Sequence, residues 1–181
     1  MAEQVTVGEL LMAEYDQIKE EQRARISFRD NLLYATLASM AAVVAAVLQA
    51  DGRPGLLLLL PPVSVLLGWT YVVNDEKISA VGRYVREELA PRLAELSGGH
   101  EPPKVFGWEV RHRADDRRTT RKRLQLAVDL LTFCLAPIAA LVVFWSSGAG
   151  PLSLLLVSLG ELAAITVLGW QIVTYADTTR S

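Results

Sequence analysis

The stretch PLSLLLVSLGELAAITVLGWQIVTY, residues 151–175, decides the fold of this chain. A helix needs about 20 mostly apolar residues to cross a bilayer. This stretch exceeds that length and contains one charged side chain, Glu161. Because backbone groups in hydrocarbon must be hydrogen-bonded within the segment, we expect a transmembrane helix here.

Three earlier blocks share this composition, at residues 31–49, 56–74 and 124–145. Hydrophobic residues make up 51% of the 181 residues, and the charged residues lie mainly between the blocks. Two short turn segments, DGRPG at 51–55 and SSGAG at 146–150, follow the first and third blocks. Segments this short and rich in glycine indicate turns between antiparallel neighbours. We therefore predict an all-α, polytopic membrane protein with four transmembrane helices in two antiparallel hairpins.

The distribution of Lys and Arg predicts the orientation. Arg53 alone lies in the first turn and none lies in the second, so the other basic residues share one side. Basic residues accumulate on the cytoplasmic side. The prediction is a multi-pass protein of the inner (plasma) membrane, with both termini in the cytoplasm. Its expected parts are a cytoplasmic helix (1–30), a first transmembrane hairpin (31–74), a cytoplasmic helical segment (75–123), a second hairpin (124–175) and a cytoplasmic tail (176–181).

The predicted cytoplasmic segments are helical extensions of the spans. Residues 5–28 favour a helix that runs into the first span. Residues 76–96 carry an apolar stripe at steps of three and four: Ile78, Val81, Val85, Leu89, Leu93 and Leu96. Such spacing places side chains on one helix face. Packing within the chain is the first interpretation of the stripe, and a self-association seam is the alternative. Pro91 is expected to kink the end of this helix.

Glu161 is the most informative residue, because it falls near the bilayer midplane, where a carboxyl is costly. It should face the bundle interior, with Ser158 one turn earlier on the same face. One interpretation is a protonated carboxyl that donates a hydrogen bond. Candidate partners are Ser64, Thr132, Thr36 and carbonyls freed by Pro137, Pro61 or Pro62. The other interpretation is an ion or proton path, formed by a ring of carboxylates in a symmetric oligomer.

Other residues suggest interfacial and packing roles. Asp129 lies near the membrane interface and could pair with Arg121 or Lys122. A basic cluster before the third span, Arg117, Arg118, Arg121, Lys122 and Arg123, predicts contact with anionic lipid headgroups. Aromatic residues near the span ends are interpreted as interfacial anchors: Trp69, Tyr71, Trp145, Trp170 and Tyr175.

Two short patterns concern how the spans pack. Small residues at Ala38, Ala42 and Ala46 predict close helix packing, first within the bundle and alternatively against a neighbouring subunit. The halves also share features: Asp30 and Asp129 enter spans, and Leu-Gly-Trp ends both hairpins, at residues 67–69 and 168–170. An internal duplication and chance similarity both remain open.

Familiar catalytic and nucleotide-binding motifs are absent from the sequence. The single cysteine, Cys134, excludes a disulfide within the chain, and neither His100 nor His112 has other metal ligands at suitable spacing. We therefore expect no enzyme activity, no cofactor, no metal and no nucleic-acid partner.

Three segments resemble a family of uncharacterised small bacterial four-span integral membrane proteins: RISFRDNLLYA (25–35), NDEKISAVGRYVR (74–86) and GWE (107–109). The resemblance covers most of the chain and implies a bacterial membrane protein. The chain is more loosely similar to two-span modules of bacterial conflict systems, which are thought to be pore-forming effectors but have a single hairpin.

These observations lead to two functional hypotheses. The first is a homo-oligomeric ion channel or pore, with cytoplasmic helices that assemble or gate it and with Glu161 in the path. The alternative is a membrane-anchored interaction module that recruits a cytoplasmic protein through the apolar stripe or the basic cluster.

Overall fold

The computed structural model describes residues 5–50, 53–96, 118–148 and 150–176. These residues are almost entirely helical and contain no strand. Four helical stretches are long and apolar enough to cross a membrane: Val7–Gln49, Pro54–Leu96, Thr120–Ser146 and Leu152–Tyr175. The prediction of an all-α chain with four membrane-length helices is confirmed.

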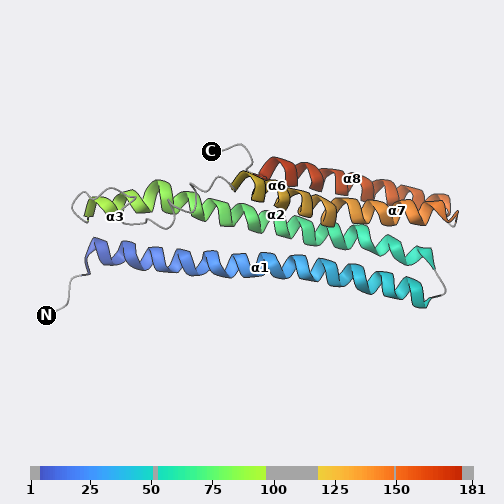
Figure 1. The fold of residues 1–181 in the computed structure, drawn as a ribbon, viewed down its shortest axis with the longest axis horizontal. Helices are drawn as coiled ribbons and strands as arrows, with labels where there is room; N and C mark the ends of the chain where they lie inside the picture. The colour runs from blue at the N-terminus through green and yellow to red at the C-terminus, as the bar shows by residue number, and fades with distance from the viewer. Residues whose placement is uncertain (1–4, 51–52, 97–117, 149, 177–181) are drawn as a thin grey trace. The chain divides into compact units, whose positions relative to one another are not determined.

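Figure 1 shows the helices of the described residues. In chain order they are α1 (Val7–Gln49), the 3₁₀ turn η1 (Pro54–Leu59), α2 (Leu60–Tyr84), the π turn η2 (Val85–Leu89), α3 (Ala90–Leu96), α6 (Arg118–Leu130), the π turn η3 (Leu131–Leu135), α7 (Ala136–Ser146) and α8 (Leu152–Tyr175). As expected, α1 continues without a break from the charged N-terminal stretch into the first apolar block.

Each of the three non-α turns ends two residues before a proline, at Pro61, Pro91 and Pro137. Proline has no N–H and its ring clashes with the carbonyl four residues earlier, so the hydrogen bonds must change register there. At Pro91 the π turn supplies this change, and the helix continues to Leu96. The expected kink at Pro91 stays a prediction. The Leu57 carbonyl, which Pro61 was expected to free, accepts the N–H of Leu60.

The chain divides into two compact units, residues 1–28 with 74–118 and residues 29–73 with 119–181. In the first unit, the buried side chains of Val85, Leu89 and Leu93 pack against α1 residues Leu11, Tyr15 and Ile18. The apolar stripe therefore packs within the chain, which was the first of its two interpretations.

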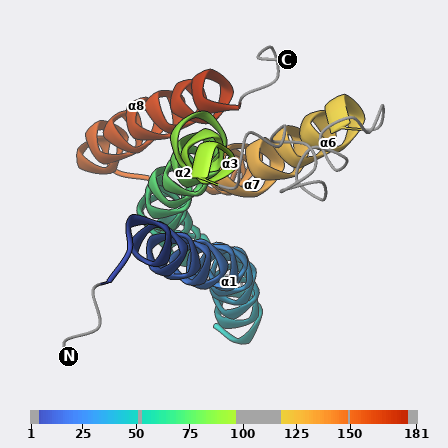
Figure 2. The same ribbon diagram turned by 90° about the vertical axis from the view of Figure 1, so that its left-hand side faces the viewer.

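In the second unit, α2 lies between α1 and α8 (Figure 2). Its core includes Tyr71 of α2, Phe133 of η3 and Leu168 of α8. Gly68 allows this close approach, because a Cβ there would lie 2.7 Å from Leu168 Cδ2 and 2.9 Å from Phe133 Cδ1. Real Cβ atoms do not come so close to other heavy atoms, so glycine is required for this packing.

The expected packing of the small residues of α1 inside the bundle is wrong. Ala38, Ala42 and Ala46 are all exposed. The buried residues of α1 are Leu32 and Thr36, which lie on another face of the helix. In a membrane, lipid can cover an exposed alanine at little cost, so small size alone did not determine which face packs inward.

Candidate functional site

Glu161 faces the interior of the second unit, as the sequence predicted. The buried α8 residues Ser158, Ile165, Leu168 and Ile172 lie seven, three and four residues apart and define the inward face. Glu161 lies on this face, one turn from Ser158. Its Oε2 atom is buried and has no hydrogen-bond partner among the described residues. A buried polar atom without a partner is costly, so its presence needs a reason.

Neither Ser158 nor the candidate partners Thr36 and Ser64 form a hydrogen bond with Glu161. Ser158 Oγ accepts a hydrogen bond from Trp145 Nε1 at 3.1 Å. The Thr36 hydroxyl donates to the Leu32 carbonyl of its own helix at 2.8 Å. Ser64 Oγ is itself buried without a partner in the described part of the chain. The geometry of the described residues therefore gives Glu161 no hydrogen-bonding role between helices.

Apolar packing separates Glu161 from one end of the bundle. From Glu161, the inward face of α8 continues through Ile165, Leu168 and Ile172, which are 1%, 0% and 4% exposed. Phe133 is fully buried and lies opposite Gly68 beside Leu168. Leu168 lies about 10 Å along the helix axis from Glu161.

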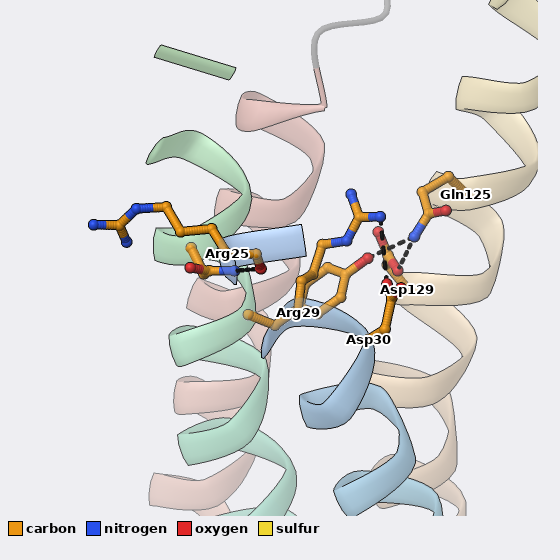
Figure 3. Close-up of polar contacts among 7 residues, drawn as sticks. Arg25, Arg29, Asp30, Gln125 and Asp129 are labelled. Atoms are coloured by element: carbon orange, nitrogen blue, oxygen red, sulfur yellow. Dashed lines mark hydrogen bonds and ion pairs between the residues drawn. The ribbon is translucent and has the colours of Figure 1, made fainter. Parts of the chain in front are cut away.

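A polar group of side chains, the Asp129 cluster, lies beyond this apolar packing. It consists of Arg29 and Asp30 of α1, Tyr71 of α2, and Gln125 and Asp129 of α6. Gln125 Nε2 donates to the Tyr71 hydroxyl at 2.5 Å and to Asp129 Oδ1 at 3.1 Å. Arg29 pairs with Asp30 at 3.4 Å. Figure 3 shows the charged and amide groups of Arg29, Asp30, Gln125 and Asp129 pointing toward one another.

One residue of this cluster, Tyr71, differs from its sequence interpretation. Tyr71 is 4% exposed, so it is a buried hydrogen-bonding residue and not an interfacial anchor. Trp69, Trp170 and Tyr175 are exposed, as anchors would be. Asp129 is buried, with 7% of its surface exposed. Its pairing with Arg121 or Lys122 stays a prediction. Arg29 and Gln125 were not among the residues predicted for a site, although the four-residue spacing of Gln125 and Asp129 is a usable signal for a helix contact.

The basic cluster is only partly described. Arg117 lies outside the described residues, and Arg118 begins α6 but its side chain is not among those described. Arg121 and Arg123 are exposed and Lys122 is half-buried. Contact of these residues with anionic lipid stays a prediction.

The comparisons with known proteins give no assignment. No family model, curated protein or solved structure matches the chain. Within the described part of the chain, no group of three or more His, Cys, Asp and Glu side chains could hold a metal ion.

Proposed function

We propose that this chain forms a homo-oligomeric ion channel in a bacterial inner membrane, with Glu161 in the ion path. In this proposal the four spans form two antiparallel hairpins, and both termini and the first unit lie in the cytoplasm. The proposal assigns no catalytic reaction. The single observation that carries it is the mid-span carboxyl of Glu161, whose buried Oε2 lacks a partner in the described residues.

The exposure of Glu161 supports a path that involves more than one copy. The residue as a whole is partly exposed, although its Oε2 is buried. A carboxyl that faces lipid at mid-span is strongly disfavoured, so water or a second copy should cover it. A Cβ at the neighbouring Gly160 would meet nothing within 4 Å, which leaves room for another helix to approach. In the apolar window of α8 only 17% of residues are buried.

Cation flux into liposomes tests the proposal. The purified protein is reconstituted, and proton and potassium uptake are compared for wild type, Glu161→Gln and Thr166→Val. Thr166 is a matched control because it is exposed on the same helix and its hydroxyl donates to the Leu162 carbonyl of that helix. We expect flux in wild type and Thr166→Val and its loss in Glu161→Gln. Equal flux in all three, or none in wild type, would refute the channel.

The oligomeric part of the proposal has its own measurement. Mass determination in mild detergent or nanodiscs should give a multiple of the 19.9 kDa chain. A strict monomer would exclude a ring of Glu161 carboxylates. The flux experiment would then decide whether a single copy conducts.

The alternative function is recruitment of a cytoplasmic protein. The packing of the first unit gives this function less support. The buried part of the apolar stripe contacts Leu11, Tyr15 and Ile18 of the same chain. A partner could use those residues only by displacing α1. The hypothesis would then rely on the exposed basic residues Arg121 and Arg123. Binding that persists in Arg121→Glu/Arg123→Glu would argue against it.

A further inference from the structure

Glu161 lies on the boundary between the buried and the exposed side of α8. On a helix surface, a side chain is next to those three and four positions away. On one side of Glu161 these neighbours are Ser158 and Ile165, which are 6% and 1% exposed. On the other side they are Val157, which is 51% exposed, and Ala164, which is half-buried. The exposed part of the glutamate therefore belongs to the side of α8 that carries Val157 and Ala164.

A line of residues on this side of α8 repeats at alternating steps of four and three. We call it the α8 seam, and its members are all exposed or half-buried: Ser153, Val157, Gly160, Ala164, Val167, Gln171 and Thr174. Two helices that pack along each other in a left-handed crossing use this spacing. Small residues at positions 153, 160, 164 and 174 let membrane helices approach closely.

The adjacent exposed line of α8 has a different composition. Its members are mostly large and apolar: Leu155, Leu159, Leu162, Thr166 and Val173. The hydroxyl of its one polar residue, Thr166, donates to the Leu162 carbonyl of its own helix. Helix interfaces in membranes are enriched in small and polar residues, whereas large apolar side chains are well suited to lipid. The seam therefore has the composition of a helix contact, and the adjacent line has that of a lipid-facing surface.

Gln171 adds a second polar side chain to the seam. It is half-buried and makes no hydrogen bond to another described residue. It follows Glu161 by ten residues, which is about 15 Å along the helix axis. An amide and a protonated carboxyl each donate and accept hydrogen bonds, so each can pair with an identical group.

We propose that the α8 seam is the contact between copies of this chain, and that the seam of a second copy in the same orientation occupies it. The inference rests on the proposed channel function and names the surface by which the copies meet. Copies in one orientation run parallel, so each seam residue lies at the level of its own counterpart. Two Glu161 carboxyls then meet at mid-span, and two Gln171 amides meet nearer the end of the helix. A different protein would have to carry matching polar groups at both depths, whereas a second copy supplies them by symmetry.

Disulfide formation between copies tests this contact without measuring flux. Cys134 is the only native cysteine, so Cys134→Ala gives a cysteine-free background. One set of variants places a single thiol on the seam: Val157→Cys, Ala164→Cys and Gln171→Cys. The matched control set places it on the adjacent line: Leu155→Cys, Leu162→Cys and Val173→Cys. All six positions are exposed or half-buried, so the substitutions leave the core unchanged.

The purified variants are oxidised with copper phenanthroline in liposomes and separated on non-reducing gels. A disulfide needs two Cβ atoms within about 4.5 Å of each other. We therefore expect disulfide-linked dimers from the seam set and none from the control set. Helical content and detergent elution confirm that each variant is folded.

Three further substitutions in the Ala164→Cys chain test how the contact forms. Gly160→Leu should abolish the dimer by holding the helices apart, and a Cβ at this position meets nothing within 4 Å in its own chain. Glu161→Gln should keep the dimer, because the amide also donates and accepts hydrogen bonds. Glu161→Leu should lower the dimer yield by up to about tenfold, the factor that corresponds to one polar contact between membrane helices.

Three results would overturn the contact. The first is dimers from both sets alike or only from the control set. The second is the absence of dimers in folded seam variants. The third is a disulfide from the seam to a different protein in cell membranes, with none between copies, since another occupant would then hold the seam.

The contact and the channel can fail separately. Seam dimers together with cation flux that ignores Glu161→Gln would keep the contact and remove the channel. Flux that is lost in Glu161→Gln, together with no seam dimers, would keep the channel and remove the contact.

Discussion

Tyr84 and Glu14 show how single side chains join the helices of the first unit. The Tyr84 hydroxyl of α2 donates a 2.6 Å hydrogen bond to Glu14 Oε1 of α1. This bond, followed by partial burial and the charge of Glu14, raises the pKa of Tyr84 above its ordinary value. The neutral phenol is therefore favoured in the folded protein relative to the unfolded chain.

The raised pKa of Tyr84 predicts a loss of stability at alkaline pH. Its contribution should be complete below the unfolded pKa of about 10 and should disappear as pH rises through the higher folded pKa. Unfolding of the first unit, measured against pH for wild type and Tyr84→Phe, should show a difference that is constant near neutrality and shrinks above pH ~10. Glu14→Gln should weaken this alkaline dependence. A difference that grows with pH would contradict the assignment.

At the start of α1, hydrogen bonds between Thr6 and Glu9 stabilise the end of the helix. The Thr6 backbone N–H and hydroxyl both donate to Glu9 Oε2, at 2.7 and 2.9 Å, and Glu9 N–H donates back to Thr6 Oγ1 at 3.3 Å. This is a capping box, which satisfies donors left unpaired at a helix start. The bonds from Thr6 hold the pKa of Glu9 below its ordinary value. The residue types and their three-residue spacing would have allowed a prediction of this cap from sequence.

At the scale of elements, two helical glycines that each follow a leucine have different surroundings. Gly68 lies against Leu168 and Phe133, whereas a Cβ at Gly160 would meet nothing within 4 Å. Helix propensity alone would make alanine better at both positions by up to about 1 kcal/mol. Packing should therefore decide whether alanine at position 68 raises or lowers the stability.

This difference gives a matched pair of substitutions. Gly68→Ala should destabilise the second unit by about 1–3 kcal/mol, because the added carbon overpacks the contact with Leu168 and Phe133. Gly160→Ala should leave the stability of the single chain unchanged or slightly increase it. Reversible unfolding in mixed micelles measures both. Similar effects from the two substitutions would show that α2, η3 and α8 do not pack as described.

The response of a helix to a proline is also decided at the scale of elements. Pro91 and Pro137 were recognised in the sequence as residues that disturb a helix. Their effect could have been a kink, an end or a local change of hydrogen bonding. The N–H of Ala90 bonds to Val85 and that of Ala136 to Leu131, so both helices continue through a π turn. Neighbouring helices hold these segments in place, and that information is not local to the proline.

At the scale of the whole molecule, the described part of the chain contains two separate hydrophobic cores. In the first unit, Leu89 of η2 is completely buried and packs against α1. Leu89→Ala should destabilise this unit by about 2–5 kcal/mol through lost contacts and a cavity. Faster hydrogen exchange in residues 7–28 and 74–96, with unchanged exchange in α7 and α8, is the expected result.

Leu96→Ala is the control for this prediction, because Leu96 belongs to the same apolar stripe but is 56% exposed. It should change stability by no more than about 0.5 kcal/mol. Equal exchange in the two variants would mean that Leu89 does not stabilise the core of the first unit. Exchange that spreads into α7 and α8 in Leu89→Ala would mean that the two units do not have separate cores.

The sequence by itself determined the class of this protein. Membrane crossing depends on the length and apolarity of a segment, and these are properties of residues 31–49, 56–74, 124–145 and 151–175 taken one at a time. For the same reason we could predict that Glu161 lies at mid-span and that the apolar stripe lies on one helix face. Each follows from helical periodicity without knowledge of neighbours.

Only the tertiary structure decided which side chains meet. Tyr71 was an anchor by its place near a span end, yet it is buried against Phe133 and bonded to Gln125. The alanines of α1 were candidates for the interior, yet they are exposed. The rotation and depth of one helix against another depend on contacts between distant segments, such as Gly68 with Leu168. In hydrocarbon those contacts, and not burial from water, decide how helices pack.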